Sequence, residues 1–92
     1  MKVYISGPMT GYENFNREAF LRAAKKLESI GLEPVHTASL PDGLDYEVYL
    51  EKSLAAMVEC KAICLLPGWE FSKGALMEYG YAKYRELPEI RL

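Results

Sequence analysis

The chain has 92 residues and a mass of 10.4 kDa; 50% of its residues are apolar, 26% are charged, and its formal net charge is −2. This length has room for one small core, so we expect a single domain over residues 1–92. The apolar fraction is too high and the net charge too low for a disordered chain. Eleven basic residues against thirteen acidic ones give no electrostatic footprint for a nucleic acid polymer, so no such partner is expected.

Cysteine content and hydropathy indicate the compartment. No run approaches the ~18 apolar residues of a membrane span, and residues 1–8 hold too short an apolar run for a signal peptide. Secreted domains this small usually carry more cysteines than Cys60 and Cys64, so we expect a cytoplasmic protein with two free thiols and no membrane partner. One histidine and two cysteines lack the spacing of a metal site, so no metal and no cofactor are expected.

Strand and helix patterns alternate along the chain. Short apolar runs predict four strands, over residues 2–6, 32–36, 62–66 and 89–92. Apolar residues at helical spacing predict three helices, which begin after Asn16, Asp45 and Ser72 as N-caps. Gly31 is expected to end the first helix. This order favours an α/β fold in which a small parallel sheet lies between helices.

The carboxyl ends of such strands are where ligands bind. Three loops reach this edge: residues 6–14, residues 37–44 with the turn signal Pro41-Asp42-Gly43, and residues 67–72. In the first loop, Gly7 and Gly11 permit a ligand to approach the backbone closely. Tyr4, Ser6 and Thr10 bring hydroxyl groups to the same place. The chain has neither GxGxxG nor GxxxxGK[ST], which excludes the usual dinucleotide and P-loop sites.

The start of the third helix is suited to an anion. Ser72 supplies a hydroxyl group, the amides of Lys73 and Gly74 follow it, and the helix dipole is positive at this end. The alternative is a simple cap beside an exposed lysine. Glu78 lies in the second turn and leans back over Gly74 and Ala75, which leaves a hollow beside its carboxylate. The alternative for Glu78 is a solvated acid on the helix surface.

Three segments together resemble a known family: residues 4–11 (YISGPMTG), 65–69 (LLPGW) and 72–78 (SKGALME). They are similar to a small family of bacterial and phage proteins in the nucleoside 2-deoxyribosyltransferase-like superfamily. The resemblance covers nearly the whole chain. It implies a flavodoxin-like three-layer α/β sandwich that acts on nucleosides or nucleoside 5′-monophosphates.

The resemblance also implies roles for individual residues. Glu78 matches the glutamate that attacks C1′ of the sugar, and Ser72 matches the serine that contacts the 5′-phosphate in nucleotide-hydrolysing members. The segment from Ser6 through Gly7 and Pro8 to Gly11 would line the sugar–phosphate side, with Tyr4 near the base. Lys73 and Gly74 would add to the phosphate site. Trp69 would stack on the base or, alternatively, bury its own loop.

Two positions depart from the superfamily pattern. The aspartate that helps to protonate the leaving base is matched by Ser53, and a second aspartate is matched by Lys61. A missing proton donor costs ~10²–10⁴-fold in rate. Nearby acids could substitute for it, namely Asp45, Glu47 and Glu51.

The resulting hypothesis is N-glycoside cleavage or deoxyribosyl transfer on a nucleoside monophosphate, with Glu78 as the nucleophile. A nucleotide-binding protein without turnover is the second hypothesis, which Ser53 and Lys61 motivate. The third is an interaction module built on the tyrosines of the last helix, namely Tyr79, Tyr81 and Tyr84. We expect a homodimer or a larger homo-oligomer, because these tyrosines are too many for one buried face. The resemblance implies the same, since superfamily members form assemblies whose sites include residues of a neighbouring subunit.

Overall fold

The computed structural model describes residues 1–38, 40, 43 and 45–92, which form a parallel sheet covered on both faces. Its strands are β1 (Lys2–Ser6), β2 (Glu33–Val35), β3 (Ala62–Leu65) and β4 (Glu89–Ile90). The order across the sheet is β2-β1-β3-β4, and every neighbouring pair is parallel. The four predicted strands are confirmed, and the order is that of the flavodoxin-like fold.

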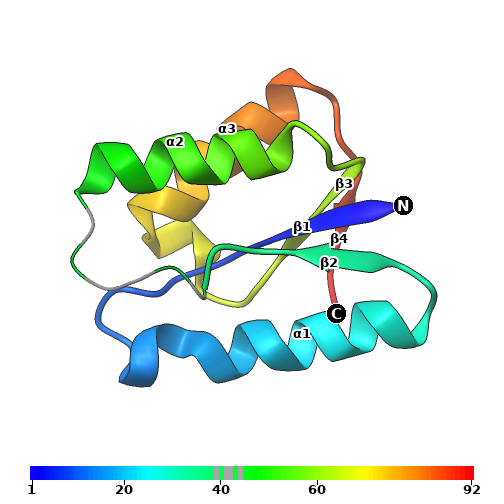
Figure 1. Cartoon of the computed structure of the whole chain (residues 1–92), viewed down its shortest axis with the longest axis horizontal. Helices are drawn as coiled ribbons and strands as arrows, with labels where there is room; N and C mark the ends of the chain where they lie inside the picture. The colour runs from blue at the N-terminus through cyan, green and yellow to red at the C-terminus, as the bar shows by residue number, and fades with distance from the viewer. Residues whose placement is uncertain (39, 41–42, 44) are drawn as a thin grey trace.

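Helices cover the two faces of the sheet unequally. α1 (Arg17–Ser29) lies on one face, and α2 (Tyr46–Met57) and α3 (Lys73–Tyr84) lie on the other (Figure 1). Short 3-10 helices precede α1 and α3, namely η1 (Glu13–Asn16) and η2 (Trp69–Phe71). The three predicted helices and the three-layer α/β class are therefore confirmed.

Alternation along β1 divides the core into two halves. Val3 and Ile5 pack with α1, whereas Tyr4 faces α2 and α3 together with Ile63 of β3. All four side chains are fully buried. A strand that is apolar on both faces is typical of the centre of a parallel sheet. Because Tyr4 and Ser6 point the same way along β1, both face the layer that contains α3.

The predicted helix caps are confirmed in part. Ser72 caps α3, since its Oγ accepts a hydrogen bond from the Ala75 amide at 3.2 Å, and Gly31 follows α1 with a φ of +84°. Asn16 and Asp45 precede α1 and α2, but neither side chain makes the predicted cap. Asn16 has a left-handed backbone, and its Nδ2 donates to the Pro8 carbonyl at 2.9 Å instead. It therefore ties the first loop to α1.

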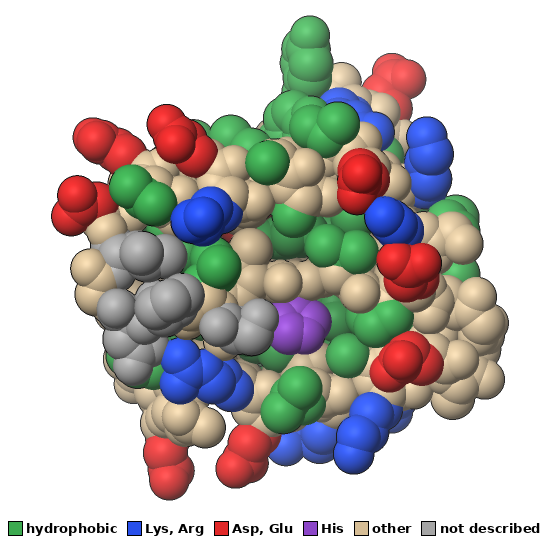
Figure 2. All heavy atoms as spheres, in the orientation of Figure 1, with side chains coloured by type: hydrophobic (Ala, Val, Ile, Leu, Met, Phe, Trp, Pro, Cys, Tyr) green, Lys and Arg blue, Asp and Glu red, His purple; other side chains and the backbone are tan. Residues whose placement is uncertain are grey.

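Surface and sequence features agree on several general points. On the face shown in Figure 2, acidic and basic side chains are interspersed rather than gathered into a patch of one sign. Cys60 and Cys64 are buried free thiols, as expected. No helix in the described ranges is long and apolar enough to cross a membrane. Of the turn signal Pro41-Asp42-Gly43, the first two residues lie outside the described residues.

Candidate functional site

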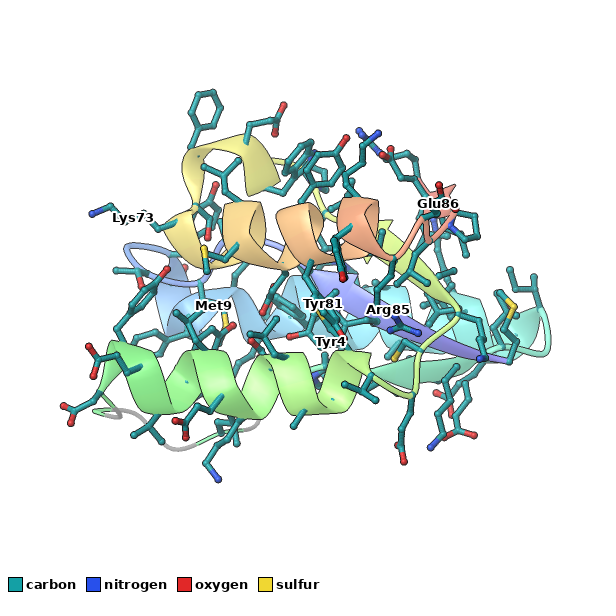
Figure 3. All side chains as sticks on the ribbon, turned by 90° about the horizontal axis from the view of Figure 1, so that it is seen from above. Tyr4, Met9, Lys73, Tyr81, Arg85 and Glu86 are labelled. Atoms are coloured by element: carbon teal, nitrogen blue, oxygen red, sulfur yellow. The ribbon has the colours of Figure 1, made fainter. Side chains whose placement is uncertain are left out.

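The most unusual side chain in the fold is the buried acid of α3. Glu78 is 1% exposed, and both of its carboxyl oxygens are hydrogen-bonded to β1. Tyr4 Oη donates to Oε2 at 2.8 Å, and Ser6 Oγ donates to Oε1 at 2.6 Å. In Figure 3, Tyr4 lies between α2 and α3, in the layer that holds these contacts. The alternative of a solvated glutamate on the helix surface is therefore wrong, and two hydrogen bonds hold the carboxyl group in one place.

Burial and hydrogen bonding act in opposite directions on this carboxyl group. Burial raises the pKa of Glu78 above its ordinary value, and the hydroxyl groups of Ser6, Tyr4, Ser53 and Tyr49 lower that pKa again without reversing the shift. Two of the four hydroxyls have another acceptor as well. Ser53 Oγ donates to the Leu50 carbonyl at 3.1 Å, and Tyr49 Oη donates to Met9 Sδ at 3.6 Å. The net result is a pKa of Glu78 above that of an ordinary glutamate.

The two tyrosines of this cluster are neutral. Burial and the neighbouring Glu78 raise the pKa of Tyr4, and the same two causes raise the pKa of Tyr49 to about 12. Both phenols therefore stay protonated around neutral pH, and each can donate a hydrogen bond to an anion.

A cavity of about 250 Å³ opens beside this cluster at the carboxyl edge of the sheet, and we call it the carboxyl-edge cavity. Its described lining residues come from the first loop, the segment after β2, and the starts of α2 and α3: Gly7, Met9, Thr10, Phe15, Thr37, Leu40, Gly43, Tyr46, Tyr49, Ser72 and Gly74. Glu78 is not one of them. It is buried behind the cavity wall, where the hydroxyl groups of Thr37 and Tyr49 lie between it and the cavity.

The start of α3 contributes to the cavity wall. Ser72 and Gly74 line it, whereas Lys73 is exposed and extends away from the amino end of the helix in Figure 3. The hollow expected above Gly74 is part of the cavity, and Tyr49 bounds it. A Cβ added at Gly74 would lie 3.5 Å from Tyr49 Cε1, which is ordinary van der Waals contact, so the ring of Tyr49 borders this space.

A family model described as a domain of unknown function (DUF4406) matches residues 1–90. The chain belongs to that family. A search among curated proteins gave no match. The match names only this family and no broader superfamily.

Of the residues predicted in the first loop of this DUF4406 protein, only some line the cavity. Gly7 lines the cavity, but it is Leu66 and not a ligand that requires a glycine here. A Cβ added at Gly7 would lie 2.7 Å from Leu66 Cβ. Pro8 is buried and serves as the acceptor for Asn16. Gly11 is exposed with a φ of +85°, and neither Pro8 nor Gly11 is among the described lining residues.

Trp69 lies elsewhere. Its ring packs on Tyr79 at 4.6 Å between centroids, with the Arg91 guanidinium 5.6 Å from the ring centroid. It is not among the described lining residues of the cavity, which supports the alternative that it buries its own loop. Its Nε1 is buried and has no hydrogen-bond partner within the described part of the chain.

The two positions that depart from the superfamily pattern differ in their locations. Ser53 is fully buried and faces Glu78, so a hydroxyl group stands where an acid was expected. Lys61 is exposed, and its amide bonds the Lys2 carbonyl at 2.8 Å, at the opposite edge of the sheet. The nearby acids are also exposed, namely Asp45, Glu47 and Glu51.

Sequence reasoning missed the residues that join Glu78 to the cavity. Thr37 and Tyr49 both line the cavity and hydrogen-bond to each other at 3.1 Å. A weak signal for Tyr49 was available, because it precedes Ser53 by one helical turn. His36, beside Thr37, plays a structural part: its Nδ1 accepts from the Ala38 amide, and its ring lies 5.9 Å from Phe20.

In the ranges that the structure describes, no three His, Cys, Asp or Glu side chains gather closely enough to hold a metal ion.

Proposed function

We propose that this protein acts on a nucleoside 5′-monophosphate, by cleaving its N-glycosidic bond or by transferring its deoxyribosyl group. The proposal rests on the resemblance of three sequence segments to the nucleoside 2-deoxyribosyltransferase-like superfamily. One observation carries it: Glu78 is buried beside the carboxyl-edge cavity, with each carboxyl oxygen held by a hydroxyl group.

A buried acid without a cationic partner needs a reason. Glutamate is almost never fully buried unless it is paired, and burial of an ionised carboxylate is costly. The described partners of Glu78 are all neutral hydroxyl groups. A shifted carboxyl group beside a cavity is typical of a functional site.

The chemistry would follow that of a retaining glycosidase. A carboxyl oxygen of Glu78 forms a bond to C1′ as the bond from C1′ to the base breaks, and the electron pair of that bond goes to the base nitrogen. Water, or a second base, then releases the sugar. Because Glu78 is 1% exposed, nucleotide binding must move a side chain that covers it.

The start of α3 would hold the 5′-phosphate. Ser72 lines the cavity and caps a helix of 12 residues, whose amino end favours an anion. Lys73 lies beside it at the surface and would add a positive charge. The cavity volume of about 250 Å³ is close to that of the smallest ligand pockets, ~300 Å³.

The test is base release from a panel of the common ribo- and deoxyribonucleoside 5′-monophosphates, followed by chromatography. We expect release by the wild-type chain and a loss of ~10⁴-fold or more in Glu78→Gln. Glu59→Gln is the matched control, because that glutamate is exposed at the other edge of the sheet. The absence of release from every nucleotide, or an unchanged rate in Glu78→Gln, would contradict the proposal.

A second function is favoured by Ser53. With a hydroxyl group in place of the expected acid, the protein would bind a nucleotide and leave it intact. Calorimetry would then show binding, and chromatography would recover only the unchanged ligand. Turnover of that ligand would rule this alternative out.

We also propose a homo-oligomer in the cytoplasm. Phe71 and Tyr84 are 91% and 84% exposed, which is unusual for large apolar side chains and suits a contact between copies. The two free thiols suit a reducing compartment. Light scattering on the purified chain would measure the mass, and a monomer at all concentrations would contradict the oligomer.

A further inference from the structure

Hydroxyl groups form a continuous path between Glu78 and the carboxyl-edge cavity. Tyr4 Oη donates to Glu78 Oε2 at 2.8 Å and lies 3.4 Å from Thr37 Oγ1. Thr37 Oγ1 is in turn 3.1 Å from Tyr49 Oη. Thr37 and Tyr49 both line the cavity, so the path ends where a ligand would lie. Three different parts of the fold supply it: β1, the segment after β2, and α2.

We propose that Glu78 reacts from its protonated form and that Tyr4, Thr37 and Tyr49 carry its proton to the departing base. This inference rests on the function proposed above. It assigns Tyr49 the role of proton donor to the leaving group, and it assigns Thr37 and Tyr4 the role of relay residues.

The transfer balances atom by atom. Oε1 of Glu78 bonds to C1′, while the bond from C1′ to the base breaks and leaves its electron pair on the base nitrogen. The carboxyl proton passes from Oε2 to Tyr4 Oη, and the former Tyr4 proton passes to Thr37. The Thr37 proton passes to Tyr49, and the Tyr49 proton goes to the base nitrogen. The products are a glycosyl ester of Glu78 and a neutral protonated base, and every hydroxyl group ends with one proton.

Hydroxyl groups suit this path because each can donate one hydrogen bond and accept others. When Glu78 carries the proton on Oε2, that oxygen becomes the donor in the 2.8 Å contact with Tyr4 Oη, and Tyr4 donates to Thr37. The outer donors then point outward, since Thr37 donates to Tyr49 and Tyr49 donates to Met9. When Glu78 is ionised, the same hydroxyl groups turn and point toward it. The longest step is the 3.4 Å between Tyr4 and Thr37, which must shorten during transfer.

The surroundings of Glu78 favour the protonated starting state. Tyr4 and Ser6 face it from β1, and Tyr49 and Ser53 face it from α2. None of these groups is charged at neutral pH. The path also supplies what the sequence lacks, since Ser53 and Lys61 stand where the superfamily has acids that assist the leaving base.

The experiment compares two leaving groups in one variant. Guanine must be protonated as it leaves 2′-deoxyguanosine 5′-monophosphate, whereas 7-methylguanine leaves its 5′-monophosphate as a neutral base without a proton. We expect Tyr49→Phe to lose ~10²–10⁴-fold in rate on the first nucleotide and no more than a few-fold on the second. Thr37→Val should show the same selectivity, and Thr37→Ser, which restores the hydroxyl group, should recover the rate. Circular dichroism confirms that each variant is folded.

The other outcomes are distinguishable. Equal losses on both nucleotides in Tyr49→Phe would show that Tyr49 serves binding or packing, which overturns the relay and leaves the proposed function standing. A Thr37→Val variant with wild-type rates overturns the path through Thr37. A wild-type chain that releases no base from the whole nucleotide panel overturns the proposed function, and the relay with it.

Discussion

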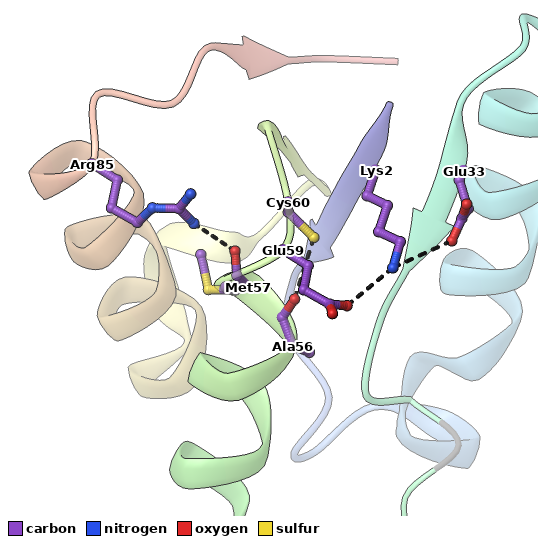
Figure 4. A network of polar contacts seen from close by, with 7 residues as sticks. All are labelled: Lys2, Glu33, Ala56, Met57, Glu59, Cys60 and Arg85. Carbon is purple, nitrogen blue, oxygen red and sulfur yellow. Dashed lines mark hydrogen bonds and ion pairs between the residues drawn. The ribbon is translucent and has the colours of Figure 1, made fainter.

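At the amino edge of the sheet, Glu33 and Glu59 lie at the surface beside Lys2, whereas near the carboxyl edge Glu78 is buried among hydroxyl groups. Figure 4 shows the first arrangement: Lys2 Nζ lies 3.0 Å from Glu59 Oε2 and 3.9 Å from Glu33 Oε2. The side chains of Lys2 and Glu59 are 37% and 68% exposed. Water and salt screen such pairs, so they add little to stability.

A partly buried contact at the same edge is of another kind. Arg85 Nη1 donates to the Met57 carbonyl at 2.6 Å and so joins the end of α3 to the end of α2 (Figure 4). Here a cation satisfies a helix carbonyl, and it has no carboxylate partner among the residues that the structure describes. The fold therefore contains cations that could have neutralised a buried acid, but it places them away from Glu78.

The contrast shows which glutamate needs a functional explanation. Exposed glutamates with a lysine neighbour are ordinary surface residues. Glu78 carries a cost of burial that its hydroxyl partners only partly offset, and replacement by an apolar residue would relieve that cost. The position of Glu78 near the carboxyl edge therefore lowers the stability of the fold, whereas the exposed glutamates of the amino edge have no such cost.

The largest effect on stability is expected at Glu78, as a dependence on pH. Burial holds its pKa above 4.5, so the folded chain binds this proton more tightly than the unfolded chain does. Stability from this group is complete below about pH 4.5 and is lost as the pH rises through the folded pKa. Glutamine does not titrate. As the pH rises, the free energy of unfolding of Glu78→Gln should therefore increase relative to that of the wild type, by about 1.4 kcal/mol for each unit between the folded and unfolded pKa values of Glu78.

Urea unfolding of the two proteins across this range measures that difference. Glu59→Gln is the control and should follow the wild type at every pH, because its carboxylate is exposed. A constant gap between Glu78→Gln and the wild type would mean that Glu78 titrates normally, and the contrast between the two edges would fail.

The second effect is steric, and it should differ between the tightly packed first loop and an open position on the surface of α3. Gly7→Ala should lower the free energy of unfolding by ~1–3 kcal/mol, because its Cβ would lie 2.7 Å from Leu66 Cβ. Gly80→Ala is the matched change in open space, since no atom lies within 4 Å of its added Cβ. Inside α3 it should raise stability by ~0.5–1 kcal/mol. Similar effects in the two variants would contradict the tight packing of the first loop.

The smallest effect is expected at the amino edge. Lys2→Met removes the contacts to Glu33 and Glu59 but keeps an unbranched apolar stem. The midpoint of urea unfolding should change slightly at low ionic strength and not at all in high salt, because the pairs are screened. A large loss that persists in high salt would show that the amino edge depends on these charges after all.

Several features follow from local sequence alone. The strands at 2–6 and 62–66 are short runs of apolar and β-branched residues, and Ser72 is a capping residue before a helical pattern. The family-like motifs also singled out Tyr4, Ser6 and Glu78, which the fold brings into direct contact. The strand and cap predictions succeeded because periodicity and caps depend on neighbours in the chain, whereas the roles of the three site residues stay predictions.

Other features depend on how distant segments meet. Thr37 ends up beside Tyr49, and the ring of Tyr49 lies over Gly74, because β2 lies next to β1 and α2 packs beside α3. Trp69 contacts Tyr79 because η2 packs beside α3. The sequence by itself determined the elements, the capped start of α3 and the acid on it. Only the tertiary structure decided what covers that acid, since strand order and helix placement set those contacts and neither is encoded in local spacing.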